Sequence, residues 1–356
     1  MIEIDGSFGE GGGQILRTAL SLSCLLNKPF RIVNIRKGRK NPGLMPQHLT
    51  SVKALQVLSD AVVTGDYKGS TELTFSPQKI KGGDFSFDIG TAGSTLLVLQ
   101  TAIPALMRAD RQSSLVLRGG THVPFSPSFH YASEVFAPIM ARIGVNVKAS
   151  IESYGFYPKG GGIIRATIMP ANKLRPLSMP QRGRILRIHG YSCAVNLPLS
   201  IAERQKSAAL GKISYHLPEL RCPTDIEAAE SKTYGTGTFI FIKAGSEHSI
   251  AGFTSLGERG KKAETVGEDA AMEFIDYYRD DAALDPYLPD QIVLYLSLCE
   301  GESTFTTCRV TDHLMTNLRV IELFHPFEWF VKGEKGKPGK VVIRGKSALH
   351  KSLNLG

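Results

Sequence analysis

The chain lacks the features that mark membrane-spanning, secreted and disulfide-bonded proteins. No stretch approaches the roughly 20 consecutive apolar residues that a membrane span needs. Residues 1–5 carry acids where a secretory leader would be basic and then apolar, so we expect a cytoplasmic protein with no membrane partner. The five cysteines are odd in number and far apart, which argues against a disulfide framework and a zinc knuckle.

The chain also lacks the familiar nucleotide-binding signatures. Neither the dinucleotide fingerprint nor a Walker A loop is present. Gly345, Lys346 and Ser347 resemble the end of a Walker A loop, but Gly339 is one residue off the required spacing. No helix can follow so close to the end of the chain, so we expect any ATP site to be of another class.

Glycine and positive charge are what the sequence has in quantity. Of the 356 residues 36 are glycine, and these cluster in short runs that indicate tight turns and close backbone approaches. Hydrophobic residues make up 42%, enough for two or more structural units. The net charge of +9 favours an anionic partner, and local clusters such as residues 36–40 are more informative than the total.

One supersecondary unit recurs along the chain. Strands and helices in the order β-α-β-α-β-β are expected across residues 2–75 and again across residues 84–168. A third copy is expected near the C-terminus, with helices at 290–298 and 312–324 and strands at 303–310, 327–331 and 340–343. Because repeats of this kind constrain the fold before any motif is considered, we predict an α/β (α+β) protein with three βαβαββ repeats.

The third copy is interrupted by a segment with structure of its own. Between a strand near residues 185–189 and the helix at 290–298 lie roughly a hundred residues that again alternate helix and strand. A structureless loop of that length is improbable, so we predict a small inserted domain. The predicted division is a repeat-built domain of 1–184 plus 281–345, an inserted domain of 185–280 and a tail of 346–356.

The first candidate site is the glycine run within residues 6–17. Glycines between a strand and a helix let backbone N–H groups approach an anion, and the helix dipole adds partial positive charge there. Glu10, Gln14 and Arg17 are spaced to lie near one face of the helix start. The alternative is a glycine-rich turn with an incidental arginine, but the three polar residues together favour a functional site.

The second candidate is the basic loop of residues 36–48. Its positive charges lie between a strand and a helix, on the same edge as the first glycine run if the repeat is correct. Arginine forks match phosphate oxygens bidentately and can hold a terminal phosphate monoester. The alternative is a solvated basic loop, which the neighbouring anion site makes less attractive.

Two further motifs are weak by themselves. Residues 154–162 indicate only a turn before a strand. Near the C-terminus, Asp312 is expected to cap a helix, which places His313 in its first turn. The positive helix end disfavours the imidazolium there and leaves a neutral ring, which is a competent nucleophile toward phosphorus. The alternative is a structural histidine.

Taken together, these stretches resemble the RNA 3′-terminal phosphate cyclase family, with the match running over residues 2–343. The most specific pieces are residues 9–17, 155–162 and 313–317. Tyr154 departs from the family pattern, which usually has His or Arg there, but it precedes a structural turn. The resemblance implies the three repeats with a small thioredoxin-like α/β domain inserted in the third.

The resemblance also implies an ATP-dependent ligase of RNA processing. ATP and a divalent metal (Mg or Mn) would be the cofactors, and RNA with a 3′-phosphate end would be the partner. His313 would attack the α-phosphate of ATP and carry AMP, which would then pass to the RNA 3′-phosphate. The neighbouring 2′-hydroxyl would close the 2′,3′-cyclic phosphodiester and expel AMP, with little entropy lost because it is already tethered.

The resemblance assigns roles residue by residue. The catalytic residues would be His313, Glu10 and Arg17, with Glu10 also the metal ligand. ATP would be bound by Gln14, Pro127, Phe253, Tyr287, Asp290 and Gln291. The RNA phosphate would be held by Arg39, Lys40 and Gln47. A homodimer is left open.

Two other functions compete with this interpretation. Some proteins similar to the family act as ribosome-assembly factors without catalysis, but the presence of His313 with Glu10, Arg17 and Asp290 speaks against that here. An enolpyruvyl transferase shares the repeated architecture, and residues 90–94 resemble a loop of that group. Such an enzyme would be larger, with six repeats.

Overall fold

The computed structural model describes residues 1–347. The first repeat is a four-stranded sheet with the strand order β1-β2-β4-β3, in which β1 and β2 are parallel and the remaining pairs are antiparallel. Its strands are β1 (Ile2–Asp5), β2 (Phe30–Val33), β3 (Val62–Thr64) and β4 (Leu73–Ser76), and its helices are α1 (Gly13–Leu26) and α2 (Pro46–Ser59).

The second repeat has the same order and the same pairing, β5-β6-β8-β7. Its strands are β5 (Asp84–Asp88), β6 (Ser113–Gly119), β7 (Val147–Ser153) and β8 (Gly162–Ile168). Its helices are α3 (Thr95–Leu106) and a second helical stretch made of α4 (Phe129–Tyr131), the π-helix η1 (Ala132–Phe136) and α5 (Ala137–Ile143).

The third repeat again follows this plan, with the order β9-β14-β16-β15. Its elements are β9 (Ser178–Met179), α8 (Leu288–Ser297), β14 (Gly301–Thr307), α9 (Asp312–Phe324), β15 (Glu328–Lys332) and β16 (Gly339–Gly345). The predicted threefold βαβαββ fold is therefore confirmed. One detail was wrong, because the opening strand is Ser178–Met179 and not residues 185–189.

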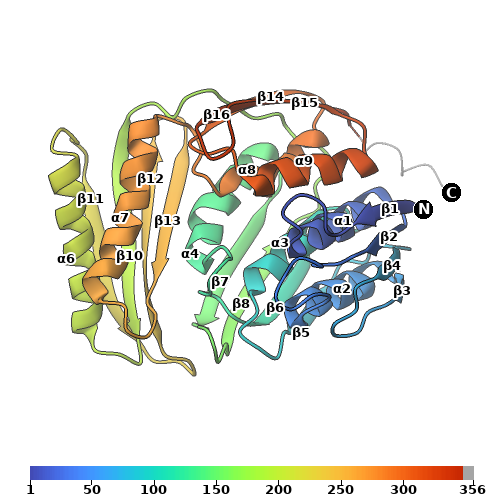
Figure 1. Cartoon of the computed structure of the whole chain (residues 1–356), viewed down its shortest axis with the longest axis horizontal. Helices are drawn as coiled ribbons and strands as arrows, with labels where there is room; N and C mark the ends of the chain where they lie inside the picture. The colour runs from blue at the N-terminus through green and yellow to red at the C-terminus, as the bar shows by residue number, and fades with distance from the viewer. Residues whose placement is uncertain (348–356) are drawn as a thin grey trace.

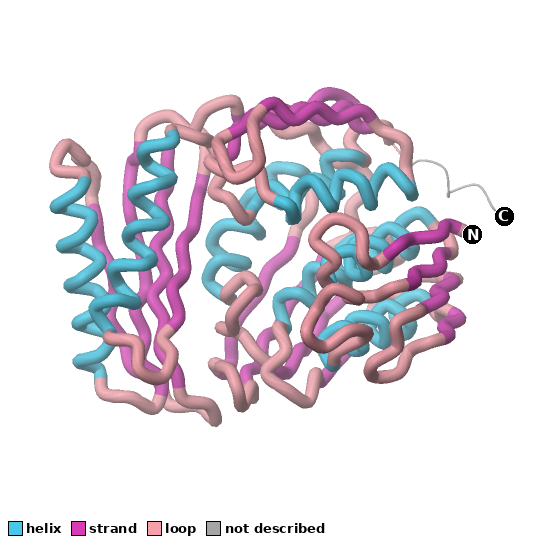
Figure 2. Tube along the Cα trace, in the orientation of Figure 1, coloured by secondary structure: helices cyan, strands magenta, loops and turns pink. Residues whose placement is uncertain are grey.

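Residues 185–189 instead begin β10 (Ile185–Val195), the long central strand of a separate sheet with the order β11-β10-β12-β13. The other strands are β11 (Thr224–Ser231), β12 (Gly237–Ser246) and β13 (Ile250–Leu256), and the helices are α6 (Leu199–His216) and α7 (Ala263–Asp280). These helices run side by side along the strands (Figure 2) and share a second hydrophobic core with them. The division at 184, 280 and 345 remains a prediction, and most of the predicted tail, residues 348–356, lies outside the described residues.

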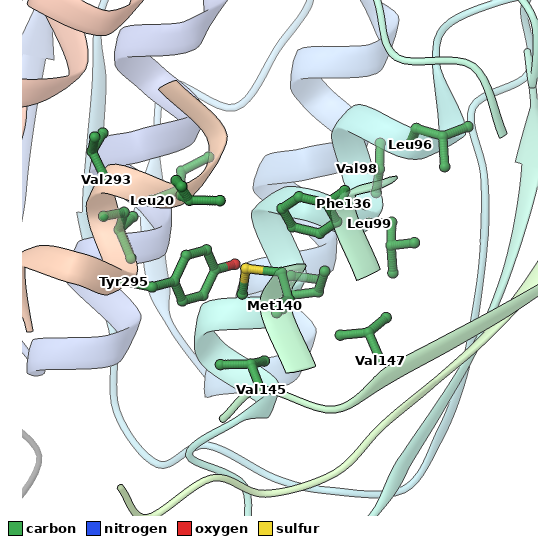
Figure 3. Close-up of a cluster of buried hydrophobic side chains, with 14 of the residues drawn as sticks. Leu20, Leu96, Val98, Leu99, Phe136, Met140, Val145, Val147, Val293 and Tyr295 are labelled. Carbon is green, nitrogen blue, oxygen red and sulfur yellow. The ribbon is translucent and has the colours of Figure 1, made fainter. Parts of the chain in front are cut away.

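The helices of the three repeats pack together, with the sheets around them (Figure 1). Helix α1 contacts α2 of its own repeat, α3 of the second repeat and α9 of the third. Figure 3 shows Leu20 of α1 and Val293 of α8 within this shared apolar interior. Each such side chain contributes about 1.5–3 kcal/mol by leaving water, so the repeats stabilise one another.

The sequence explains where α1 starts and stops. The glycine run leads into a helix whose buried face is almost continuous from Gln14 to Leu25, and Asn27 ends it in the left-handed conformation with φ of 52°. Among residues 1–347, none of the helices combines the length and the apolar character needed to traverse a bilayer.

Candidate active site

Four helices begin around one point. The N-terminal ends of α1, α2, α8 and α9 come together because side chains at each start contact the next: His48 of α2 lies against Gly13, and Gln14 of α1 reaches both Asp290 and His313. Each helix start carries partial positive charge, so their convergence favours a polyanion such as a phosphate chain.

The glycine run forms the floor of this site. Gly9 and Gly11 have φ of 57° and 59°, values that L side chains rarely adopt. A Cβ on Gly13 would overlap the His48 ring and lie 3.0 Å from Nη1 of Arg17. The N-cap residue Gly12 has no side chain to satisfy the first amides of α1, so these remain available to a ligand.

Glu10 connects the glycine run to two cations. Its Oε1 pairs with Nη2 of Arg39, and its Oε2 lies 2.5 Å from Nδ1 of His313. Among the described side chains, Oε2 is buried and has no partner with full hydrogen-bond geometry. This carboxylate therefore raises the pKa of His313, and His313 and Arg39 hold its own pKa below the usual value.

The surroundings of His313 determine its tautomer. Nδ1 faces Oε1 of Gln14 as well as Oε2 of Glu10, and both of these oxygens can only accept. The orientation of Gln14 is set because its Nε2 donates to Oδ2 of Asp290 at 2.9 Å. Nδ1 must therefore carry the proton, and the neutral ring has its lone pair on Nε2.

Two expectations about the start of α9 were wrong. The cap is Thr311, whose hydroxyl accepts from the amide of Leu314 at 3.1 Å, whereas Asp312 is the first helical residue and pairs with Lys335. The helix end was expected to keep the ring neutral by lowering its pKa. The pKa of His313 is raised instead, because the carboxylate of Glu10 in contact with the ring outweighs the partial charge of the helix.

A buried polar network fixes Gln14 and Asp290. Asn317 donates to the backbone oxygen of Asp290 at 2.7 Å and accepts from Thr18 at 2.7 Å, which joins α8, α9 and α1. Burial raises the pKa of Asp290 to about 6. Asn317 belongs to the quoted motif 313–317, but its role could not be assigned from the sequence, because it depends on a contact with a distant helix.

Arg17 lies beneath this network with its charge intact. Burial lowers its pKa to about 10, while the charges of Asp290 and Glu10 oppose that change. Among residues 1–347 no hydrogen-bond or ion-pair partner is found for its guanidinium, which leaves the donors of Arg17 free for a phosphate.

The predicted phosphate loop is only partly assembled. Arg39 reaches Glu10, Lys40 is exposed, and Oε1 of Gln47 accepts from the amide of Ser94 at 3.1 Å, which connects this loop to the second repeat. Gln47 is thus a link between repeats in this structure, and the RNA-binding roles remain predictions.

Sequence reasoning missed His48. This ring is buried, and its Nδ1 accepts from the amide of Met45 at 3.1 Å, so the proton of the neutral ring is on Nε2. Burial and the nearby charges of Arg17 and Arg36 lower the pKa of His48 to about 3. Its Nε2 faces the position of Gly13, so His48 is a neutral donor at the anion site. Its place beside Gln47 in the basic motif was the only available signal.

The residues predicted for ATP lie at the start of α8. Tyr287 is partly exposed and donates to Glu273 at 2.9 Å, and Gln291 donates to the backbone oxygen of Tyr287 at 2.7 Å. Asp285, which the sequence did not reveal, accepts from the amides of Tyr287 and Leu288 and from the hydroxyl of Tyr131. It holds the helix start in place, and burial raises its pKa to about 6.

Phe253 and Pro127, the two residues predicted to contact the adenine, differ in burial. Phe253 is fully buried in the second core, where it packs against Phe274 and Tyr277, so it offers no face to a ligand and this assignment is corrected. Pro127 is half-buried just before α4, and Tyr131, one turn later, lies edge-on to Tyr287 with ring centroids 6.2 Å apart.

Within the described residues, the protein does not by itself supply a full set of ligands for a divalent cation at this site. Within residues 1–347 no cluster of three or more His, Cys, Asp or Glu side chains is arranged to hold a metal. Glu10 is nevertheless a carboxylate at the anion site, with Oε1 paired to Arg39 and Oε2 in contact with His313. Mg²⁺ commonly uses one or two carboxylates together with substrate phosphates, and Glu10 suits that mode.

Comparison with known proteins agrees with this geometry. The profile of a protein family described as RNA 3′-terminal phosphate cyclase matches residues 8–331. The chain is 45% identical to the RNA 3′-terminal phosphate cyclase of Sulfolobus acidocaldarius, over 94% of this chain and 97% of that protein. It is 44% identical to the protein of the same name in Pyrobaculum neutrophilum, over 96% and 97% of the two chains. A protein of the same name in Methylococcus capsulatus is 41% identical, over 98% of each chain.

A likeness among solved structures is too weak for an argument. The enolpyruvyl transferase NikO from Streptomyces tendae aligns with a TM-score of 0.37 and 9% identity, over 97% of this chain and 48% of that one.

The site places a histidine beside a cradle of helix starts that suits an anion. The chain belongs to the RNA 3′-terminal phosphate cyclase family. The resemblance stated from the motifs is therefore confirmed, as is the expectation that the protein is an enzyme of this family.

Proposed function

We propose that the protein uses ATP to convert an RNA 3′-phosphate end into a 2′,3′-cyclic phosphodiester, with His313 carrying AMP between the two steps. The observation that carries this proposal is the environment of His313. Two acceptors, Glu10 and Gln14, face Nδ1, so the lone pair is on Nε2 at the mouth of four helix starts.

In the first step, Nε2 forms a bond to the α-phosphorus of ATP and pyrophosphate leaves with the bridging oxygen. The positive charge that develops on the ring is stabilised by Glu10, which already contacts Nδ1. Arg17 and His48 provide donors for the phosphate oxygens. A divalent cation bound by Glu10 and the ATP phosphates would neutralise further charge on the pyrophosphate.

In the second step, an oxygen of the RNA 3′-phosphate attacks the AMP phosphorus, and the bond to Nε2 breaks with its electron pair returning to the ring. The phosphate monoester has then gained AMP as a leaving group. The neighbouring 2′-hydroxyl attacks that phosphate, AMP is expelled, and the hydroxyl proton passes to water. The proximity of the hydroxyl makes this closure favourable, because both reacting groups belong to one nucleotide.

The same arrangement supports the proposal that the basic loop of residues 36–48 holds the RNA phosphate. Arg39 reaches the site and Lys40 is exposed beside it, which supports a role in holding the RNA phosphate. We also infer that Pro127 and Tyr287 border the adenine and that Asp290 and Gln291, at the start of the same helix as Tyr287, bind ATP. The cytoplasmic location and a homodimer remain predictions.

Labelling distinguishes this proposal from a non-catalytic assembly factor. Incubation with ATP labelled at the α-phosphorus is expected to leave acid-labile label on the wild type, whereas ATP labelled at the γ-phosphorus leaves none. A chase with a 3′-phosphorylated oligoribonucleotide is expected to remove the label and produce the cyclic end. An unlabelled wild-type protein would favour the assembly factor.

A further inference from the structure

Three loops at one edge of the molecule expose aromatic side chains. They are residues 120–128, 154–161 and 232–236, and they carry Phe125, Tyr157 and Tyr234. Phe125 is fully exposed, and Tyr157 and Tyr234 are 72% and 73% exposed. Phe125 also has φ of 60°, in the left-handed region that a bulky residue rarely adopts. Large aromatics held in solvent by strained or short loops indicate a binding surface.

The three loops are held together by close backbone contacts. The end of β6 pairs with the start of β8, and His122 bridges to Phe156. In the third loop, a Cβ on Gly235 would lie 3.3 Å from the oxygen of Gly160, and the Tyr234 ring covers Gly161. The loop between β7 and β8 and the loop before β12 lie at the same lower edge in Figure 1.

The charge of this edge is positive. The three loops contain Lys159 and Lys232 and no carboxylate. Nζ of Lys159 lies 6.0 Å from the centroid of the Tyr234 ring, which places a cation beside an exposed aromatic face. Aromatic faces next to lysines are the combination that binds single-stranded nucleic acid, because bases stack on the rings and the backbone is neutralised.

This edge is continuous with the phosphate loop. A Cβ on Gly160 would lie 2.7 Å from the oxygen of Thr91, and Ser94, at the other end of the same short loop, donates its amide to Gln47. The four residues from Thr91 to Ser94 span at most about 14 Å. Gln47 is beside His48, which contacts the glycine run, so one strand can pass from the aromatic edge to the phosphate cradle.

We propose that Phe125, Tyr157, Tyr234 and Lys159, together called the aromatic edge, bind the unpaired nucleotides that precede the 3′-phosphate of the RNA substrate. This inference rests on the proposed function. The bases stack on the rings and Lys159 contacts the backbone, so the enzyme prefers single-stranded ends that are several nucleotides long. The contacts are with ring faces and backbone, so this preference does not depend on sequence.

The test measures KM for cyclisation with 3′-phosphorylated oligoribonucleotides of about two and about eight nucleotides. Tyr157→Ala and Tyr234→Ala are each expected to raise the KM of the long substrate by about tenfold and to leave that of the short one unchanged. Tyr157→Phe and Tyr234→Phe retain the stacking face and are expected to behave like the wild type. Tyr215→Ala is the matched control, since Tyr215 is 81% exposed at the end of α6 that is far from the loop 232–236.

Two controls separate this inference from the proposed function. Labelling of the protein by ATP alone is expected to be normal in the Tyr157 and Tyr234 variants, because neither tyrosine is among the residues assigned to ATP. Equal KM values for the long substrate in the wild type and both alanine variants would overturn the proposal that the aromatic edge binds RNA. A change of oligomeric state in these variants without a change in KM would also overturn the proposal, because the aromatic edge would then be a protein interface. A wild type that is labelled by ATP but cyclises neither substrate would instead overturn the proposed function.

Discussion

His313 and His48 are both near the start of a helix and both face the same site, yet their rings are in opposite states. Nδ1 of His313 faces Glu10 and Gln14, which can only accept, so Nε2 has a lone pair. Nδ1 of His48 accepts from the amide of Met45, so Nε2 has a proton. The pKa of His313 is raised by the carboxylate, and that of His48 is lowered to about 3 by burial.

The difference shows that the partner of Nδ1, and not the position in the helix, determines what a histidine can do. A carboxylate and an amide oxygen leave the lone pair of His313 on Nε2, as its proposed role requires. A backbone amide makes the other a hydrogen-bond donor to an anion. The following predictions test this contrast, starting with the largest effect.

Replacement of His313 is expected to reduce labelling by ATP much more than replacement of His48. His313→Ala should abolish labelling by α-labelled ATP and leave the melting temperature close to that of the wild type, because the ring is about half exposed. His48→Leu should retain some labelling, with a loss of about a hundredfold as for other single donors to a reacting phosphate or oxyanion. His48→Gln, which can present an N–H donor near the position of Nε2, should recover most of it. Label on His313→Ala would remove the assigned nucleophile.

Glu10 is expected to have the next largest effect. Glu10→Gln removes the charge that stabilises the positive ring during attack, and the rate of labelling should fall by about a hundredfold or more. Gln14→Ala should have a smaller effect, since the carboxylate still holds Nδ1. These rates are measured in a single turnover with excess ATP. A larger loss in Gln14→Ala than in Glu10→Gln would show that the amide, not the carboxylate, sets the state of the ring.

The pH dependence of labelling should distinguish the two histidines. The nucleophile must be neutral, and the pKa of His313 is raised, so the rate should increase as the pH rises through that pKa. In Glu10→Gln the raising influence is lost, and the increase should occur at a lower pH. With its pKa near 3, His48 stays neutral between about pH 5 and pH 9, so His48→Gln should leave the profile in place. A profile that moves to higher pH in Glu10→Gln would contradict this account.

Arg39 is expected to have the smallest effect, and it concerns RNA instead of ATP. Arg39→Ala should weaken binding of a 3′-phosphorylated oligoribonucleotide and reduce the slope of log affinity against log salt by about 0.7, the value for one contact with a single strand. Arg31→Ala is a matched control, because the Arg31 and Arg39 side chains are 43% and 41% exposed and Arg31, in β2, is paired with Glu72 instead of Glu10. An unchanged slope would exclude Arg39 from the phosphate contacts.

The sequence predicted the repeated fold because the copies share one order of elements, and the first two copies also share a glycine at the start of a helix. The strand Ser178–Met179 was missed because a two-residue strand has no periodicity to detect. The longer strand Ile185–Val195 was taken in its place, because only the pairing partners show that it belongs to another sheet.

The sequence predicted which local motifs contribute to the candidate site. Glu10, Gln14 and His313 meet as expected, from the two ends of the chain. The buried links of Asn317 and Asp285 were not predictable, because each contacts elements far away in sequence. Phe253 was misplaced because an aromatic in a strand offers no sign of which face is buried.

The proposed chemistry depends on which ring nitrogen of His313 bonds to AMP. The most direct measurement is nitrogen–phosphorus coupling in the isolated adenylylated protein prepared with labelled histidine. We expect AMP on Nε2, with Nδ1 protonated and facing Glu10. AMP bonded to Nδ1, or to a residue other than His313, would contradict it.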